Sequence, residues 1–183
     1  MYVNYEDFIR SIPNSPEEGI LFRDITPLLN DHEVYSKAVR DMAAPYLNKK
    51  IDAVAAIESR GYLFGAPVAN ILGVPLVTIR KPGKLPFTTY KASYKLEYGE
   101  STLEIHTDSF NKNANVLLVD DLIATGGTII AAIQLIEKAG GKVSGISVLI
   151  ELAELEGRNL LADYKLNTLI TYADDKDQLN LLE

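Results

Sequence analysis

Two adjacent carboxylates, Asp120 and Asp121, follow a run of four apolar residues, Val116–Val119, and precede the segment Ala124–Thr128, which reads ATGGT. The apolar run predicts a buried strand, and ligands of parallel sheets bind at the carboxyl ends of strands. The two glycines of the segment permit backbone conformations closed to other residues, so successive N–H groups can point into one concavity before a helix. The two threonines add hydroxyl donors. This arrangement suits the binding of a phosphate monoester.

The same pattern also has a purely structural interpretation, in which a glycine turn precedes a capped helix and the two acids lie in a loop. The combination of apolar strand, acid pair, ATGGT and helix favours the phosphate site. The segment has no lysine in the GxxxxGK[ST] arrangement of nucleoside-triphosphate loops, and it lacks the GxGxxG fingerprint of dinucleotide-binding folds. Both of these classes of phosphate site are therefore excluded.

The thirteen-residue stretch Val116–Thr128 (VLLVDDLIATGGT) resembles the phosphoribosyl pyrophosphate signature of the type I phosphoribosyltransferase family. In that family the two acids contact the 2′- and 3′-hydroxyls of ribose, directly or through Mg²⁺, and the loop that follows holds the 5′-phosphate. The resemblance implies these roles for the acids Asp120 and Asp121 and for the loop residues Ala124, Thr125, Gly126, Gly127 and Thr128. Carboxylates suit sugar hydroxyls, and a neutral nest of N–H groups suits a dianion.

A second candidate segment, Glu58–Gly61 (ESRG), follows the apolar run Ala53–Ile57. It resembles the pyrophosphate loop of the adenine-specific members of the family. The resemblance implies that Ser59 and Arg60 bind diphosphate, and that the peptide bond between Glu58 and Ser59 is cis. A guanidinium offers a forked, permanent positive charge to such a group. A polar turn between a strand and a helix is the structural alternative.

A third segment, Leu21–Leu29 (LFRDITPLL), resembles the adenine-recognition segment of the same members. The resemblance implies that Phe22 stacks on the base, that the Leu21 carbonyl accepts from the exocyclic amino group, and that the Arg23 N–H donates to ring N1. A purine with an oxo group at that edge would place acceptor against acceptor and be rejected. Without the resemblance, Phe22 is typical of a core residue.

A fourth feature is a candidate lid formed by Arg80–Pro86 (RKPGKLP) and Ala92–Gly99 (ASYKLEYG). The resemblance implies that this lid closes over the site and that Lys81 and Lys84 meet diphosphate. The run Phe87–Lys91 (FTTYK) departs from the family, because many relatives carry a more flexible run with Gly-Pro there. A solvated basic turn on a hairpin is the structural alternative for the lysines.

Glu97 and Tyr98, at the far end of the candidate lid, are expected near the purine, with Tyr98 in contact with substrate. Glu97 is the candidate for handling the proton of the purine ring, and a solvated strand glutamate is its structural alternative. Together with Arg60 and Lys84, which would neutralise the leaving group, Glu97 makes up the predicted catalytic set.

The resemblance implies the reaction of adenine with phosphoribosyl pyrophosphate to AMP and pyrophosphate, with Mg²⁺ as cofactor and a homodimer as the assembly. Two alternatives stay open: an enzyme of the same fold for xanthine, hypoxanthine or guanine, and a purine-responsive regulator that uses the motif as an effector pocket. The net charge of −7 is unsuited to nucleic acid, and the first 20 residues are too few for a winged-helix domain.

Composition places the chain among soluble globular proteins with one domain, because 47% of its 183 residues are hydrophobic and 23% are charged. The absence of cysteine excludes a disulfide scaffold, a thiolate zinc site and a cysteine nucleophile. No apolar run approaches the roughly 18 residues of a membrane span, and the N-terminus MYVNYEDFIR does not resemble a signal peptide. The expected location is the cytoplasm, with no membrane partner.

Apolar strands that alternate with helical patterns predict an α/β fold with a central, mainly parallel sheet flanked by helices. The resemblance makes this the type I phosphoribosyltransferase fold, in one domain of residues 1–183 with an N-terminal hood at about 1–30 and a lid and flap at about 81–108. The expected helices are Tyr5–Ile12 capped by Asn4, Asp31 to about Asn48, Tyr62–Leu72 and Ile129–Ala139, and a short helix is expected before the last strand. The expected strands are Ala53–Ile57, Val74–Ile79, Val116–Val119, Val143–Leu149 and Thr168–Tyr172, with a hairpin at 90–108 around Gly99 and no regular element at 19–29.

Overall fold

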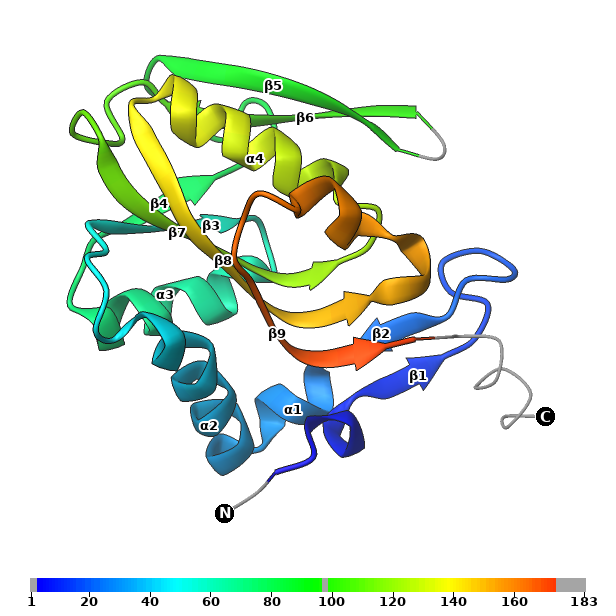
Figure 1. The fold of residues 1–183 in the computed structure, drawn as a ribbon. Coiled ribbons are helices and arrows are strands. Elements are labelled where there is room, and N and C mark those ends of the chain that lie inside the picture. Colours follow the sequence, from blue (N-terminus) through cyan, green and yellow to red (C-terminus); the bar gives the residue numbers. More distant parts are fainter. Residues whose placement is uncertain (1–2, 97–98, 174–183) are drawn as a thin grey trace.

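The computed structural model describes residues 3–96 and 99–173 of the 183-residue chain. Its centre is a parallel sheet with the strand order β4-β3-β7-β8-β9 (Figure 1). These strands are β3 (Ala53–Ile57), β4 (Leu76–Ile79), β7 (Ala114–Ile123), β8 (Gly141–Leu152) and β9 (Leu166–Tyr172). The predicted α/β class with a central parallel sheet is confirmed. In the described part of the chain, no helix is long and apolar enough to cross a membrane.

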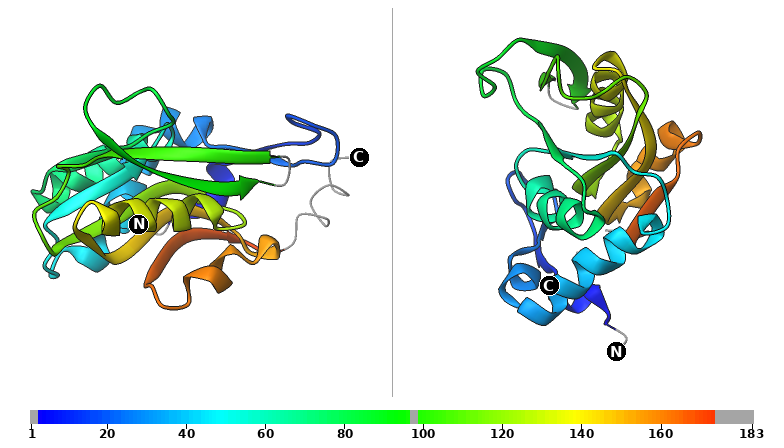
Figure 2. Two further views of the ribbon diagram at one scale, coloured as in Figure 1. Left: turned by 90° about the horizontal axis from the view of Figure 1, so that it is seen from above. Right: turned by 90° about the vertical axis from the view of Figure 1, so that its left-hand side faces the viewer.

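Both faces of the sheet are covered, as the apolar strands predicted (Figure 2). Val54 and Leu117 belong to the core cluster beneath α2 and α3, whereas Ala55 and Leu118 belong to the cluster beneath α4 and an antiparallel hairpin. Neighbouring residues of a strand point to opposite faces, which explains the two cores. The covering elements are α2 (His32–Ala43), α3 (Gly61–Leu72), α4 (Gly127–Lys138) and the hairpin strands β5 (Thr89–Leu96) and β6 (Gly99–His106).

The strand order determines where a ligand can bind. The chain continues from β3 to β4 on one side, while β7 pairs with β3 on the other side, with Ala56 opposite Val119. A gap outside the carboxyl ends of the strands opens at such a reversal of order. The acid pair and the ESRG segment therefore meet at one edge of the sheet.

The N-terminal segment forms a separate antiparallel pair, β1 and β2, which is fastened to the end of β9. The guanidinium of Arg23 on β2 lies 3.6 Å from the ring centre of Tyr172 on β9. This contact brings β2 to the same edge of the sheet as the carboxyl ends of the strands (Figure 1). The remaining elements are η1 (Tyr5–Phe8), β1 (Arg10–Ile12), β2 (Phe22–Asp24), α1 (Thr26–Asn30), η2 (Ala44–Tyr46), η3 (Ala153–Leu155) and η4 (Gly157–Leu161), where η marks a 3-10 helix.

The predicted helix Tyr5–Ile12 is wrong, because a 3-10 turn is followed there by strand β1. Asn4 does not cap the turn: its side-chain amide donates to the Asp7 carboxylate at 3.0 Å. The backbone of 10–12 pairs instead with β2, a partner that local pattern does not reveal. The segment 19–29, expected to be irregular, contains β2 and most of α1.

Other predicted elements differ in their bounds by a few residues, and three of these differences matter here. The helix expected to reach Asn48 ends at Ala43 and is followed by a 3-10 turn that contains Pro45, a residue without an N–H for a helical bond. Strand β7 continues to Ile123, so the acid pair lies within it and not in a loop after it. Helix α4 begins at Gly127, two residues earlier than predicted.

The start of helix α2 offers a test of the local sequence signals. Asp31 accepts from the N–H groups of Glu33 and Val34, each at 3.0 Å, as its predicted capping role requires. Asp31→Ala is expected to lower the free energy of unfolding by about 1 kcal/mol in urea titrations. Asn4→Ala is the control, because Asn4 caps no N–H group, and it is expected to cost less than about 0.5 kcal/mol. Equal losses in the two variants would contradict the assignment.

Candidate active site

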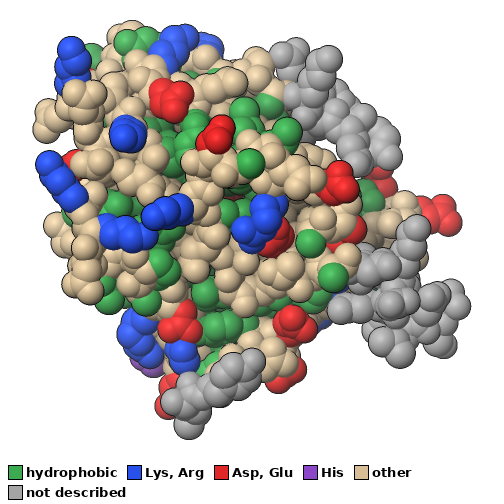
Figure 3. Space-filling view, viewed as in Figure 1, with side chains coloured by type: hydrophobic (Ala, Val, Ile, Leu, Met, Phe, Trp, Pro, Cys, Tyr) green, Lys and Arg blue, Asp and Glu red, His purple; other side chains and the backbone are tan. Residues whose placement is uncertain are grey.

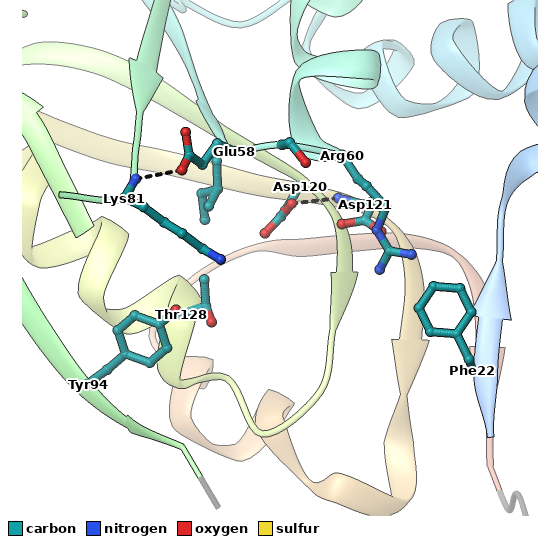
Figure 4. A pocket seen from close by; sticks show the side chains of 10 residues that line it. Phe22, Glu58, Arg60, Lys81, Tyr94, Asp120, Asp121 and Thr128 are labelled. Atoms are coloured by element: carbon teal, nitrogen blue, oxygen red, sulfur yellow. Dashed lines mark hydrogen bonds and ion pairs between the residues drawn. The ribbon is translucent and has the colours of Figure 1, made fainter. Parts of the chain in front are cut away.

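A cavity of about 420 Å³ opens at the carboxyl ends of β3 and β7 (Figure 4). It brings together residues from β2, the ESRG segment, the loop after β4, strand β5, strand β7 and the start of α4. The lining residues are Phe22, Ile57, Glu58, Ser59, Arg60, Lys81, Tyr94, Asp120, Asp121 and Thr128. Seven of the predicted site residues lie among them, although the sequence separates them by up to 106 positions.

The acid pair is buried, with Asp120 7% and Asp121 6% exposed. The Asp121 N–H donates to Asp120 Oδ1 at 2.9 Å. A side chain at Gly61 on α3 would place its Cβ 2.7 Å from the same oxygen, so glycine there lets α3 pack against the acid without displacing it. Burial, and then the negative charge of Asp121, raise the pKa of Asp120 well above its ordinary value. Burial also raises the pKa of Asp121, and the Arg60 guanidinium opposes this shift.

Two buried like charges at a cavity wall form an incomplete site for a cation or for hydroxyl donors. Mg²⁺ is usually bound by one or two carboxylates together with substrate phosphates, and it retains several waters. Among residues 3–96 and 99–173, no group of three or more His, Cys, Asp or Glu residues could enclose a metal ion. The acid pair therefore fits an ion carried in with a phosphorylated substrate better than a permanent protein cage.

Arg60 lies between the acid pair and an exposed aromatic ring (Figure 4). Its Nε lies 2.7 Å from Asp121 Oδ2, and its guanidinium carbon lies 5.3 Å from the ring centre of Phe22. Phe22 is 36% exposed, which excludes the alternative of a core residue. An exposed ring at a cavity wall can stack on a flat ligand.

The ATGGT segment joins β7 to the first turn of α4. Gly126 precedes the helix with a φ of +84°, a conformation that favours glycine. The first helical bond runs from the Ile130 N–H to the Gly126 carbonyl at 3.0 Å, so the N–H groups of 127–129 have no acceptor within the helix. Gly126, at the N-cap, has no side chain to accept from them. These donors and the helix dipole make the start of α4 an anion site beside the acid pair.

Three residues of the cavity were not predicted as site residues, Ile57, Glu58 and Tyr94. Glu58 accepts from Arg80 Nε at 2.7 Å and from the Lys81 N–H at 2.9 Å, so it fixes the start of the 80–88 loop over the cavity. Burial alone would raise the pKa of Glu58, but these two donors hold it below its ordinary value. The sequence did contain a signal for the contact between Glu58 and Arg80. An acidic residue follows β3 and a basic residue follows β4, the strand paired with it. The predicted cis bond between Glu58 and Ser59 is confirmed.

Residues 28–177 match the family model of the phosphoribosyl transferase domain. Over 164 residues the chain is 51% identical to an adenine phosphoribosyltransferase of Chloroflexus aurantiacus, covering 90% of this chain and 95% of the relative. The chain belongs to the adenine phosphoribosyltransferase family.

Solved structures of adenine phosphoribosyltransferases share its fold, which confirms the predicted type I phosphoribosyltransferase architecture. The enzyme of Thermoanaerobacter pseudethanolicus superposes with a TM-score of 0.87 at 47% identity, over 92% of this chain and 98% of the other. The enzyme of Saccharomyces cerevisiae gives 0.85 at 37% identity, over 90% and 96%. The yeast structure is a complex with adenine and D-2,5-dideoxy-2,5-imino-altritol 1,6-bisphosphate.

Several of the predicted site residues do not line the cavity. Leu21 and Arg23 are buried, and the Arg23 guanidinium donates to Ser11 Oγ at 2.6 Å. The role expected of each of them involves backbone atoms only. Lys84 is exposed, and its carbonyl accepts from Arg80 at 3.3 Å. The loop residues 124–127 adjoin the cavity next to Thr128 without being among its lining residues. Glu97 and Tyr98 lie outside the described residues.

The burial of the acid pair predicts a conflict between stability and activity. The ordinary pKa of aspartate in an unfolded chain is about 3.9. Because the folded pKa of Asp120 is raised, the folded protein holds the proton more tightly, and stability falls as the pH rises from about 4 through the folded value. Asp120→Asn is therefore expected to raise the melting temperature at pH 7 by about 2 °C or more.

The advantage of Asp120→Asn should shrink as the pH approaches 4, where wild-type Asp120 is protonated as well. Scanning calorimetry at several pH values measures it. Asp108→Asn, at an exposed position after β6, is the control and should change the melting temperature little at any pH. A variant of Asp120 less stable than wild type at pH 7 contradicts the prediction.

Proposed function

We propose that this chain transfers the 5-phosphoribosyl group of phosphoribosyl pyrophosphate to N9 of adenine, giving AMP and pyrophosphate in purine salvage. The observation that carries the proposal is the single cavity in which a buried acid pair, a helix N-terminus and Arg60 lie together. Its relatives are named adenine phosphoribosyltransferases, and the yeast structure contains adenine. These findings favour adenine over the oxopurine alternatives.

Adenine would bind at β2. The exposed ring of Phe22 would stack on the base, since a neutral purine is recognised by stacking and hydrogen bonds and not by charge. The Leu21 carbonyl and the Arg23 N–H would read the amino group and ring N1. The contact of Arg23 with Tyr172 supports these roles, because it holds the backbone of β2 at the edge of the cavity.

Phosphoribosyl pyrophosphate would span the rest of the cavity. Asp120 and Asp121 would accept from the ribose hydroxyls, while the N–H groups at the start of α4 and the Thr125 and Thr128 hydroxyls would hold the 5′-phosphate. Ser59, Arg60, Lys81 and Lys84 would face the diphosphate. Mg²⁺, held by the substrate oxygens and by Asp120 or Asp121, would neutralise charge on the leaving diphosphate.

In the reaction, the bond between C1 of ribose and the diphosphate oxygen breaks as adenine N9 bonds to the same carbon. Positive charge develops on the sugar, and the proton of N9 leaves the ring. Arg60 and the lysines stabilise the departing diphosphate, and Glu97 accepts the proton. The 80–88 loop and the β5–β6 hairpin form the lid that excludes water from the activated sugar. The enzyme contributes mainly orientation and electrostatics.

The assembly and its partners are also proposals. A homodimer in the cytoplasm is the expected state, and analytical ultracentrifugation and cell fractionation would test it. Nucleic acid is not an expected partner, because the net charge is −7 and basic side chains on the face shown in Figure 3 are interspersed with acidic ones. Retention of duplex DNA on nitrocellulose would instead support the regulator alternative.

AMP formation from adenine and phosphoribosyl pyrophosphate is the direct test. AMP is expected with Mg²⁺ present and is expected to be lost in EDTA and recovered when Mg²⁺ is added back. Hypoxanthine, guanine and xanthine, each offered alone at the same concentration, should give little or no nucleotide. Preference for one of these bases over adenine would overturn the proposed specificity.

Glu97 has a separate test. Glu97→Gln retains shape and hydrogen bonding but not basicity, so the single-turnover rate of AMP formation should fall by roughly 10²–10⁴, the range of general acid–base catalysis. The affinity for phosphoribosyl pyrophosphate should change little. Glu100→Gln, three positions further along the sequence, is the matched control and should retain the wild-type rate. A loss below about threefold for Glu97→Gln favours the solvated-glutamate alternative.

A further inference from the structure

The loop Ala124–Thr128, proposed to bind the 5′-phosphate, packs against the backbone of a distant residue, Gly157. A Cβ at Gly126 would lie 2.9 Å from the Gly157 carbonyl oxygen, and a Cβ at Gly157 would lie 2.8 Å from the Gly126 nitrogen and still closer to the Ala124 carbonyl. Gly157 is buried at the start of η4, which lies beside the first turn of α4 (Figure 1). The two backbones are therefore in direct contact, and glycine at 157 permits this approach.

The residue next to Gly157 connects this support to the central sheet. Arg158 Nε donates to Glu151 Oε1 at 2.6 Å, and Arg158 Nη2 donates to Glu151 Oε2. Glu151 lies near the end of β8, opposite Ile123, the last residue of β7 before the loop. The ion pair thus links η4 to the strand beside the one from which the loop emerges. At the other end of η4, Leu161 is buried in the core.

The chemistry of the ion pair suits a positioning role. Glu151 is 3% exposed, and a buried carboxylate requires a partner. A guanidinium that donates twice fixes its own direction as well as its distance, which a lysine cannot do. Neither side chain is among the residues that line the cavity. The two-point ion pair therefore restrains Gly157, and through it the loop at Gly126.

We infer that Glu151 and Arg158 are positioning residues for the 5′-phosphate: their ion pair holds the Gly157 backbone against Ala124–Gly126 and so sets the arrangement of the N–H groups at the start of α4. The inference rests on the proposed function for the identity of the anion. It predicts that weakening the pair impairs binding of the phosphorylated substrate and leaves binding of adenine intact.

The decisive variant is Arg158→Lys, which retains a positive charge beside Glu151 but removes the two-point geometry. Its KM for phosphoribosyl pyrophosphate should rise about tenfold, because small misplacements of binding groups have effects of this order or larger. Its kcat and its KM for adenine should stay within about twofold of wild type. Arg158→Gln, which leaves Glu151 without a charged partner, should raise the same KM further.

Two control variants separate a local effect from a general loss of stability. Lys37→Gln breaks an ion pair with Asp41, 2.5 Å away one turn along α2 and outside the lining of the cavity. Gly145→Ala introduces a Cβ 2.7 Å from the Tyr46 hydroxyl oxygen in the middle of β8. Both should lower the melting temperature and leave the KM for phosphoribosyl pyrophosphate unchanged. Gly157→Ala, with its Cβ against the loop backbone, should raise that KM at least as much as Arg158→Lys does.

Calorimetric titration with ribose 5-phosphate provides a readout without turnover. Its affinity should fall in Arg158→Lys and Gly157→Ala in parallel with the rise in KM. An unchanged KM in folded Arg158→Lys, an equal rise in KM for adenine, or unfolding of every variant of the pair would each overturn the inference. Failure of the wild-type chain to make AMP would instead overturn the proposed function. The titration would still show whether the Glu151–Arg158 pair affects phosphate binding.

Discussion

The placement of two carboxylates in a buried strand beside a reversal of strand order is the constraint on which the site depends. Asp120 and Asp121 are costly to ionise where they lie, and the surroundings accommodate them with a glycine on α3, one backbone donor and the Arg60 guanidinium. A ligand that supplies hydroxyl donors or a cation would lower the cost of ionising these carboxylates further. The proposed function and the cost in stability therefore originate from the same two residues.

A chain with a net charge of −7 must bind a substrate that is itself highly negative. Groups close to the substrate can outweigh the net charge, because charges separated by more than about 10 Å are largely screened by salt. The N–H groups at the start of α4, Arg60 and Lys81 converge on one cavity. Glu58 adds negative charge at the cavity wall, but it is occupied by Arg80 and the Lys81 N–H, so it orders the basic loop without opposing the substrate.

The division between a rigid sheet and attached hairpins matches the division of roles. Groups expected to bind ribose and phosphate lie in strand β7 and at the start of helix α4, where backbone hydrogen bonds fix them. Groups expected to meet adenine and diphosphate, such as Phe22 and Lys81, lie on a two-stranded pair and a loop outside the sheet. A rigid phosphate site beside more adjustable walls allows a bulky substrate to enter and a lid to close afterwards. The Glu151–Arg158 ion pair supports the rigid half of this division.

Local sequence determined much about this protein: the apolar strands, the capped start of α2 and the glycine-dependent turn between β7 and α4. These follow from short-range periodicity and from residue types that only a few backbone conformations suit. The tertiary structure alone decided that 10–12 is a strand, because its partner, β2, forms only when the chain folds back. It also decided that Glu58 meets Arg80 and that Gly157 meets Gly126. Such contacts join residues 22 and 31 positions apart, and they arise from the packing of strands and loops that no local pattern encodes.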